Sequence, residues 1–240
     1  MATLDRHLVS ITAPASFAAE QYQGLRLTIE RVSRSRDVKV IAVTSPAAGD
    51  GKTVTSINLA GALARGSSDR VLLIDADLRR PSIGTLLGIG REACGLADTL
   101  GDQAAAFANA LQPTPLPNLS VLPAGTPRGG VSELLRSASL ETMLRDARAQ
   151  FAYIVVDTPP LLPVFDTAVL AKLVDALLVV VSANQTPRKL LGEALNMLDP
   201  AKVLGIVFNR DERPLFGYYN SYNRYYGEYF SDASQAASGA

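Results

Sequence analysis

The sequence predicts an α/β fold, a doubly wound and mostly parallel β-sheet flanked by helices, with a flexible C-terminal tail. From residue 38 onward, short runs of apolar and often β-branched residues alternate with patterns typical of helices. Most of these runs are apolar at consecutive positions, as is typical of parallel strands that are buried on both faces. From about Arg213 the periodicity stops, and the closing SDASQAASGA has too little apolar surface to offset the entropy of ordering it.

The expected elements follow one another along the chain. A helix is expected first, over residues 17–33. The strands expected after it are 38–44, 70–75, 119–122, 153–157, 176–181 and 203–208. The crossover helices expected between strands include 53–65, 139–150 and 187–198. Residues 111–130 contain five prolines and are expected to form a loop-rich insertion around one strand.

This order divides the chain into three segments. Residues 1–33 form an N-terminal extension with a helix, residues 34–213 form the domain that contains the sheet, and residues 214–240 form the tyrosine-rich tail. A chain of 240 residues, 48% of them hydrophobic, is long enough for one domain with a substantial core.

Charge and cysteine content exclude several classes of protein. Acidic and basic residues number 23 each, so there is no overall attraction to nucleic acid, which is not expected as a partner. The single Cys94 excludes an internal disulfide and any metal or cluster site built from several cysteines. The chain starts without the apolar run of a signal peptide and lacks any run of about 18 apolar residues. We therefore expect a cytoplasmic protein without direct membrane insertion.

A phosphate-binding loop is predicted where the first strand ends, in TSPAAGDGKT. Gly49 and Gly51 allow backbone N–H groups to face phosphates, Lys52 offers a charge to the β- and γ-phosphates, and Thr53 can ligate magnesium. The strict pattern has glycine at position 46, where this chain has Pro46, but the preceding strand and following helix provide the required context. The residues expected to bind nucleotide here are Ala48, Gly49, Asp50, Gly51, Lys52, Thr53 and Val54.

Two acidic residues close the second strand, in LLIDADLRRP. Asp75 and Asp77 are two positions apart, so both side chains are expected on the same face of an extended segment, at the end where ligands bind. One can hold magnesium while the other accepts a proton from an attacking hydroxyl. The alternative is that Asp75 only caps the following turn. Arg79 and Arg80 can neutralise phosphate charge or pair with acids elsewhere.

Two further polar residues end strands in the same way. Asp157 follows four apolar residues in YIVVDTPP, a pattern typical of an acid that anchors a magnesium-bound water; the alternative is a simple turn former. Asn209 ends the last strand, where its amide can read an adenine edge or, nearly as well, form a turn.

Tyrosine is concentrated near the C-terminus, in FGYYNSYNRYYGEYFSD. The segment offers almost no aliphatic residue for buried rings to pack against, so it is expected to be exposed. A stacking platform for single-stranded nucleic acid would need more basic residues than the one arginine within the cluster. A self-association segment and a set of phosphate acceptors remain as the other interpretations. The cluster consists of Tyr218, Tyr219, Tyr222, Tyr225, Tyr226 and Tyr229.

Taken together, these motifs resemble the deviant Walker-motif branch of the P-loop NTPases, which includes septum-positioning and plasmid-partition ATPases. The chain is more similar to the bacterial tyrosine kinases of capsule and exopolysaccharide assembly. The resemblance runs from about residue 17 to the tail, through TSPAAGDGKT, LLIDADLRRP, NLSVLPAG with SELL, YIVVDTPP and the tyrosine cluster. The partition and septum ATPases carry a signature lysine that falls at Ala47 here, so its absence favours the kinase branch.

The resemblance implies transfer of the ATP γ-phosphoryl group to tail tyrosines of a neighbouring subunit, with ATP and Mg²⁺ as cofactors. It implies that the catalytic residues are Lys52, Asp75, Asp77 and Asp157, with either acid of the Asp75 and Asp77 pair as the base. The residues implied for Mg²⁺ are Thr53, Asp77 and Asp157. The six clustered tyrosines are the implied phosphate acceptors.

The resemblance also implies a homo-oligomer, arranged as a ring in the family, and a separate membrane protein that activates the kinase at the inner face of the plasma membrane. The family's oligomerisation helix carries glutamate, arginine and arginine at three-residue spacing, where this chain has Glu20, Gln23 and Arg26. Loss of the middle cation removes one charge-assisted contact. Ala48 stands where the family usually has proline, a change that is compatible with binding by the backbone.

A second functional class stays open at this point. It is a nucleotide-switched ATPase that recruits a membrane partner, with the tyrosines as a docking surface and without kinase activity. The tail and Ala47 favour the kinase. An iron–sulfur carrier of the same superfamily is disfavoured, because one cysteine per chain makes a poor set of cluster ligands.

Overall fold

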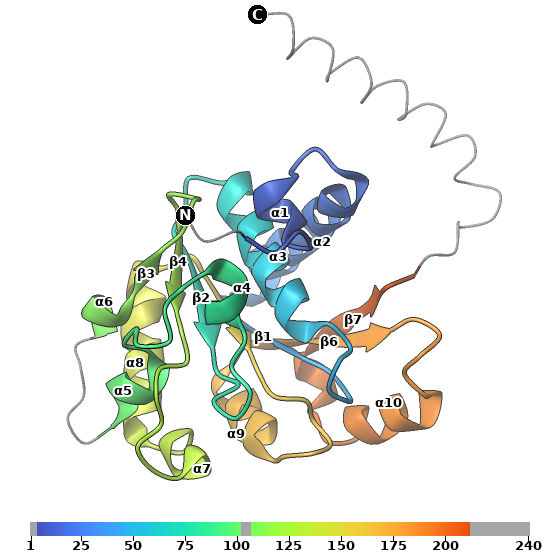
Figure 1. Ribbon diagram of the computed structural model, residues 1–240. Helices are drawn as coiled ribbons and strands as arrows, with labels where there is room; N and C mark the ends of the chain where they lie inside the picture. The colour runs from blue at the N-terminus through green and yellow to red at the C-terminus, as the bar shows by residue number, and fades with distance from the viewer. Residues whose placement is uncertain (1–3, 102–106, 212–240) are drawn as a thin grey trace, which may run out of the picture. The chain divides into compact units, whose positions relative to one another are not determined.

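A computed structural model describes residues 4–101 and 107–211 of the chain (Figure 1). Residues up to Asn209 form one compact unit, and a second unit begins at Arg210. The tyrosine cluster and the rest of the tail lie outside the described residues.

The described part of the chain contains a seven-stranded sheet in the order β3-β4-β2-β5-β1-β6-β7. Every neighbouring pair is parallel except β3 and β4. The strands are β1 (Val40–Thr44), β2 (Val71–Asp75), β3 (Gln112–Pro113), β4 (Leu119–Leu122), β5 (Tyr153–Asp157), β6 (Ala176–Ser182) and β7 (Val203–Asn209). The predicted doubly wound α/β fold is confirmed, including all six predicted strands.

Helices cover both faces of this sheet. The longer ones are α2 (Phe17–Arg36), α3 (Lys52–Gly66), α8 (Ala138–Gln150), α9 (Asp166–Leu173) and α10 (Arg188–Leu195). The shorter ones are α1 (Val9–Thr12), α4 (Ile83–Leu87), α5 (Leu96–Leu100), α6 (Phe107–Ala110), α7 (Val131–Leu134) and the 3₁₀ turn η1 (Pro200–Lys202). Figure 1 shows α2 and α3 on one side of the sheet and α9 and α10 on the other.

Alternation along each strand builds a separate core on each face. On β1, Val40 and Ala42 join the cluster that includes α8, α9 and α10, whereas Ile41 and Val43 join the cluster that includes α2 and α3. Since successive side chains of a strand point to opposite faces, an all-apolar strand supplies both cores. The central strands β1, β2 and β6 are buried at every position.

Apart from α9, which has eight residues, the elements that were not among the predicted ones are short. The edge strand β3 has two residues and runs antiparallel to β4, inside the proline-rich insertion. Helices α4 to α7 have four or five residues each, too few to show a helical period in the sequence. The predicted helix 187–198 ends at Leu195.

Helix α2 packs on α3, the helix that follows the phosphate loop. It begins at an N-cap, where the Ser16 side chain accepts the Ala19 N–H, and ends at Asp37 in the left-handed conformation. It therefore runs three residues past the predicted end, and the predicted segment boundary after residue 33 falls inside it. On α3, the Asn58 side chain holds the N-terminal segment by accepting the Ser10 N–H and donating to the His7 carbonyl.

No helix within residues 4–101 and 107–211 has the length and apolar character that crossing a membrane requires.

Candidate nucleotide and phosphoryl-transfer site

The loop between β1 and α3 has the backbone of a phosphate-binding turn. Gly49 and Gly51 have φ values of 92° and 93°, a region that side chains disfavour. At Gly51 there is a second reason for glycine, because a Cβ would collide with the side chain of Asn209. Helix α3 starts directly at Lys52, so its unpaired N–H groups lie at the loop, where anions bind. The predicted binding residues Ala48 to Val54 are thus brought into one turn.

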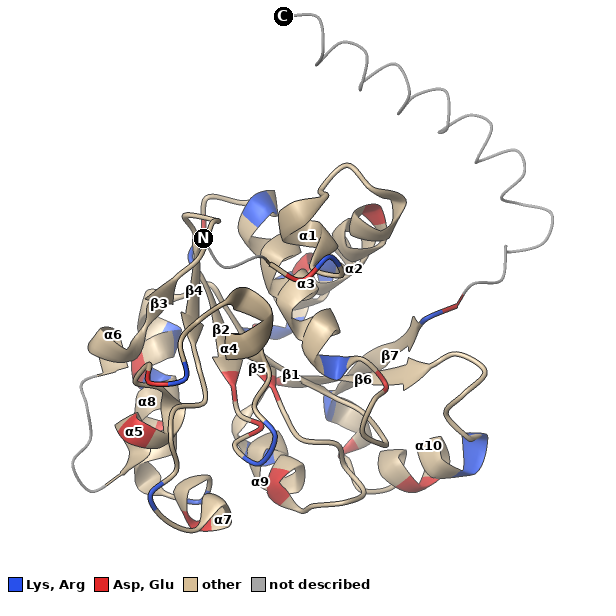
Figure 2. Cartoon of the chain, in the orientation of Figure 1, with Lys and Arg blue, Asp and Glu red and all other residues tan. Residues whose placement is uncertain are grey.

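Lys52 lies among the predicted acids. Its Nζ is 2.8 Å from Asp77 Oδ2 and 3.7 Å from Asp157 Oδ2, and its side chain is only 11% exposed. Burial alone would lower the pKa of Lys52, but the nearby Asp157 and Asp77 outweigh burial and raise it. The lysine therefore keeps its charge at the edge of the sheet where β2 and β5 end in acidic residues (Figure 2).

Asp157 is fully buried and is held by two hydroxyl groups of α3. Its Oδ2 accepts a hydrogen bond of 2.7 Å from Thr53 Oγ1, and its Oδ1 accepts one of 3.0 Å from Ser56 Oγ. Burial raises the pKa of Asp157, although Lys52 and the two hydroxyls favour its charged form. Ser56 was not predicted from the sequence. The available signal was its position three residues after Thr53, on the same helix face.

The predicted pair Asp75 and Asp77 divides between two tasks. Strand β2 ends at Asp75, and Asp77 lies two residues beyond that end, so the common face of the two side chains remains a prediction. Asp75 Oδ2 accepts the N–H groups of Ser82 and Ile83 at the start of α4, at 3.1 and 3.0 Å, which is the turn-capping alternative. Asp77 instead reaches Lys52.

Asp75 nevertheless interacts electrostatically with the charged residues of the site, Asp157 and Lys52. Burial, followed by the nearby charge of Asp157, raises the pKa of Asp75 to about 7. The site thus combines an ion-paired acid, Asp77, with an acid that titrates near neutral pH.

Asp50 ties the phosphate loop to the ends of β6 and β7. Its Oδ1 accepts a 2.7 Å hydrogen bond from Thr186 Oγ1, and its Oδ2 accepts the Ala47 N–H at 3.2 Å. The Asn209 amide donates to the Asp50 carbonyl at 3.0 Å. Asn209 therefore contacts the loop, while its predicted reading of adenine remains a prediction. Thr186 was not predicted, because it lies four residues beyond the end of the buried strand β6 rather than at a strand end as Asp157 does.

Replacing Thr186 with valine should weaken nucleotide binding about tenfold. The change removes the hydroxyl donor to Asp50 and the acceptor of the Ser182 N–H while keeping the shape, and hydrogen bonds to charged groups contribute about 1.5 to 3 kcal/mol. Titration with a fluorescent ATP analogue measures the effect. Thr186→Ser keeps the hydroxyl and should bind as the wild type does; equal affinity of the valine variant would contradict the role.

The donor set suits Mg²⁺ bound together with a nucleotide. Within the described residues no cluster of three or more His, Cys, Asp or Glu side chains could hold a metal ion unaided. Thr53 Oγ1 and an oxygen of Asp157 lie 2.7 Å apart. Asp77 is close to them because it forms an ion pair with Lys52, the residue before Thr53. Mg²⁺ is commonly held in proteins by one or two such oxygens together with water and substrate phosphates.

The residues predicted for oligomerisation lie on α2, away from this site. Glu20 is exposed, whereas Arg26 is only 15% exposed and pairs with Glu30 at 2.6 Å. Gln23 Oε1 accepts a 2.8 Å hydrogen bond from Arg26 Nε. In a single copy Gln23 and Arg26 therefore contact each other, and the role of all three residues between copies stays a prediction.

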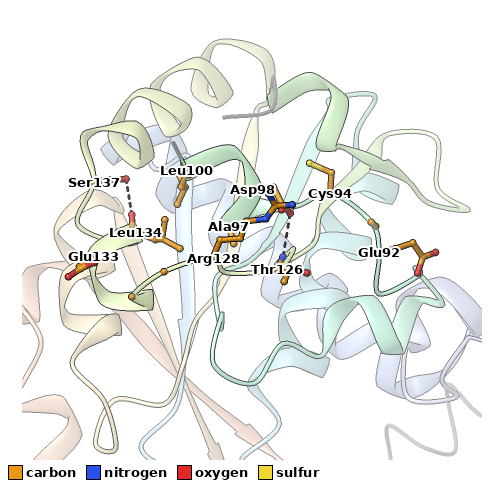
Figure 3. Close-up of a pocket in the computed structure, with 14 residues that line it drawn as sticks. Glu92, Cys94, Ala97, Asp98, Leu100, Thr126, Arg128, Glu133, Leu134 and Ser137 are labelled. Atoms are coloured by element: carbon orange, nitrogen blue, oxygen red, sulfur yellow. Dashed lines mark hydrogen bonds between the residues drawn. The ribbon is translucent and has the colours of Figure 1, made fainter. Parts of the chain in front are cut away.

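A separate hollow of about 950 Å³ lies between α5 and α7 (Figure 3). Cys94, Asp98 and Arg128 are among its lining residues, and no residue predicted for the nucleotide site lines it. The Asp98 carboxylate already accepts the N–H groups of Gly95 and Thr126, at 2.9 and 3.4 Å. The predicted acids and lysine thus converge elsewhere, at the phosphate loop.

A phosphate loop followed by a lysine, a threonine and strand-end acids defines a P-loop nucleotide-binding protein. The family model described as an AAA domain matches residues 38–201. The chain is 31% identical over 223 residues to tyrosine-protein kinase YwqD of Bacillus subtilis, covering 91% of this chain and 93% of that protein. It is 32% identical to the succinoglycan biosynthesis transport protein ExoP of Rhizobium meliloti, over 92% of this chain but only 29% of ExoP.

Among solved structures, the kinase domain of the Escherichia coli tyrosine kinase ETK superposes with a TM-score of 0.80 at 26% identity, covering 91% of this chain and 86% of that one. The chain belongs to the AAA-domain family of P-loop proteins and, within it, to the bacterial tyrosine-protein kinases. The family predicted from the motifs is confirmed, and the alternative of a nucleotide switch without kinase activity is not favoured.

Proposed function

We propose that this protein transfers the γ-phosphoryl group of ATP to tyrosines in the C-terminal cluster of a neighbouring copy. The observation that supports the proposal most directly is the convergence of Lys52, Asp77 and Asp157 at the phosphate loop of a member of the tyrosine-protein kinase family. Phosphoryl transfer requires mainly positioning and charge neutralisation, which a buried lysine and a helix N-terminus supply.

In the proposed reaction, the phenolic oxygen of a tyrosine attacks the γ-phosphorus. The new oxygen–phosphorus bond forms as the bond to the β,γ-bridging oxygen breaks, and that electron pair leaves with ADP. The phenolic proton passes to an acid of the Asp75 and Asp77 pair. The pKa of Asp75 is raised to about 7, which suits a base, but its buried carboxylate already accepts the N–H groups of Ser82 and Ile83. Asp77 is engaged with Lys52.

The nucleotide-binding roles follow from the same geometry. N–H groups of residues 48–54 would hold the phosphates, and Lys52 would place its charge on the β- and γ-phosphates. Thr53, Asp77 and Asp157 would hold Mg²⁺, directly or through water. When bound, Mg²⁺ neutralises the negative charge that develops on the transferring group.

The proposed acceptors are the six clustered tyrosines, which lie outside the described residues. The other two tyrosines of the chain, Tyr22 and Tyr153, are half-buried on α2 and β5. Burial raises the pKa of Tyr22, although the nearby Thr55 and Asn58 side chains favour its charged form. A partly buried phenol is a poor acceptor, which leaves the cluster as the proposed substrate.

Mass spectrometry of the intact protein after incubation with Mg²⁺ and ATP tests this proposal. The wild type should gain mass in units of one phosphate. Replacing the six clustered tyrosines with phenylalanine should remove most of that gain while leaving ATP binding unchanged, because the nucleotide site is untouched. A wild-type protein that gains no phosphate, even with its membrane activator, would overturn the kinase proposal and leave the nucleotide-switched interaction protein as the alternative.

The proposal extends to organisation in the cell. Residues 34–213 would be the kinase domain, residues 1–33 an extension that helps to assemble a homo-oligomer, and residues 214–240 the acceptor tail. A separate membrane-bound activator would recruit the chain from the cytoplasm to the inner face of the plasma membrane. The partial match to ExoP supports a link to a larger assembly, because this chain corresponds to 29% of that transport protein.

A further inference from the structure

An arginine beside the site is fixed by a buried acid. The loop after β2 passes over α9 (Figure 1), and there Arg79 forms a bidentate pair with Asp166, with Nε–Oδ2 at 2.6 Å and Nη2–Oδ1 at 3.2 Å. The Ser132 hydroxyl bonds to both partners, because it donates to Asp166 Oδ1 at 2.9 Å and accepts from Arg79 Nη2 at 3.1 Å. We call Arg79, Asp166 and Ser132 together the clamp. Ser132 is the serine of the SELL motif, which the nucleotide chemistry leaves unused.

The clamp keeps Asp166 charged. Burial opposes the charge, since Asp166 is only 3% exposed, yet the hydrogen bonds from Arg79 and Ser132 hold the pKa of Asp166 below its usual range. The guanidinium plane is therefore fixed, as is usual for a bidentate pair between arginine and a carboxylate.

Arg79 has further N–H groups that can donate hydrogen bonds to a ligand. A guanidinium carries five N–H groups, and this clamp engages the one on Nε and the two on Nη2. No residue in the described part of the chain accepts a hydrogen bond from Nη1, and the side chain is 43% exposed. Arg79 stands two positions after Asp77, and the charge of Asp77 acts on its guanidinium, so Arg79 lies near the proposed transfer site.

An exposed aromatic ring accompanies the clamp. Phe165 immediately precedes Asp166, and its side chain is 74% exposed. Its carbonyl accepts the Val169 N–H at 3.3 Å, and the next residue is locked to Arg79, so the backbone that carries the ring is held. Single exposed apolar residues are common on protein surfaces. This one differs because the ion pair between Asp166 and Arg79 connects its neighbour to the loop of Asp77.

We propose that Phe165 and Arg79 form a docking subsite for the tyrosine cluster of another copy of this chain, an inference that rests on the proposed function. The Phe165 ring would stack on a tyrosine, and Arg79 Nη1 would receive an acidic group of the same segment. The charges match, because FGYYNSYNRYYGEYFSD carries Glu228 and Asp232 against Arg224. Each phosphate adds roughly 1.5 to 2 negative charges, so the attraction to Arg79 grows as the segment is modified.

The subsite can be tested by kinetics between two full-length chains. The acceptor is the Lys52→Met variant, which keeps its tail, and the enzyme carries alanine at the six tail tyrosines so that it cannot modify itself. Phe165→Ala in the enzyme should raise the KM for the acceptor roughly fivefold, the range expected for loss of an aromatic pair, with kcat and the KM for ATP unchanged. Phe165→Tyr should restore the wild-type KM because it keeps a ring.

Phe208→Ala is the matched control, since Phe208 is also exposed, at 65%, but lies on β7. Arg79→Lys should raise the acceptor KM as well. Only the planar guanidinium can bind Asp166 with two hydrogen bonds and keep further N–H groups free for the acceptor, and lysine lacks it. An unchanged acceptor KM for Phe165→Ala, or an equal change for Phe208→Ala, would overturn the subsite. If the unsubstituted enzyme transfers no phosphate to the acceptor, the proposed function itself fails, which is a separate result.

Discussion

A Lys52→Met variant should incorporate no measurable phosphate and should also unfold more easily than the wild type. Lys52 is proposed to place its charge on the transferred phosphate, so its loss removes one of the cations that stabilise the reaction. The same charge lies 2.8 Å from Asp77 and 3.7 Å from Asp157 inside the protein. Removing one partner of a buried ion pair leaves an uncompensated charge and typically costs about 3 to 5 kcal/mol of stability.

The two effects can be separated by a double variant. Lys52→Met with Asp77→Asn removes the stranded charge as well, so urea unfolding should recover part of the lost stability while phosphate incorporation stays absent. Mass spectrometry and urea titration of the two variants and of Asp77→Asn alone provide the comparison. A stable and active Lys52→Met protein would contradict both the catalytic and the structural role.

The stability of the metal-free and nucleotide-free protein should fall as the pH rises from 5.5 to 8. The pKa of Asp75 is raised to about 7 in the folded protein, against 3.8 as its ordinary value, so the folded state retains a proton that the unfolded state has lost. This stabilisation is complete below about pH 4 and disappears as the pH rises through 7. One pKa unit corresponds to 1.36 kcal/mol, so the loss between pH 5.5 and 8 is on the order of 2 kcal/mol.

Urea unfolding at pH 5.5 and pH 8, with a chelator present, measures this dependence. Asp75→Asn cannot ionise, yet its side-chain oxygen can still accept the N–H groups of Ser82 and Ile83, so much of the pH dependence should vanish. Asp157 contributes in the same direction, because burial raises its pKa too, and should account for the slope that remains. An identical slope in the wild type and the variant would show that Asp75 does not carry the effect.

The sheet could be predicted because its central strands are buried on both faces and read as continuous apolar runs, as in VIAVT of β1 and ALLVVVS of β6. The phosphate loop could be predicted because its mechanism requires particular residue types at fixed spacing. Helices α4 to α7 could not, since four or five residues do not complete two helical turns.

Within the site, the sequence could not predict which side chains contact one another across long distances along the chain. The sequence indicated Asp75 and Asp77 as a pair, but not that the two carboxylates bind different partners. The contact between Asp50 and Thr186 joins residues 136 positions apart, and it depends on how two loops meet above the sheet. The proposed acceptor segment lies outside the described residues, so its role remains a prediction.

The contacts of Arg26 on α2 bear on how copies of this kinase would associate. In a single copy its guanidinium already bonds to Gln23 and Glu30. A contact with another copy through Arg26 would therefore either use the N–H groups that remain on the guanidinium or exchange a partner already bound within the copy. In an exchange, only the difference between two ion pairs contributes to association, and that difference is small. Assembly through Arg26 alone should then be weak and should depend on protein concentration.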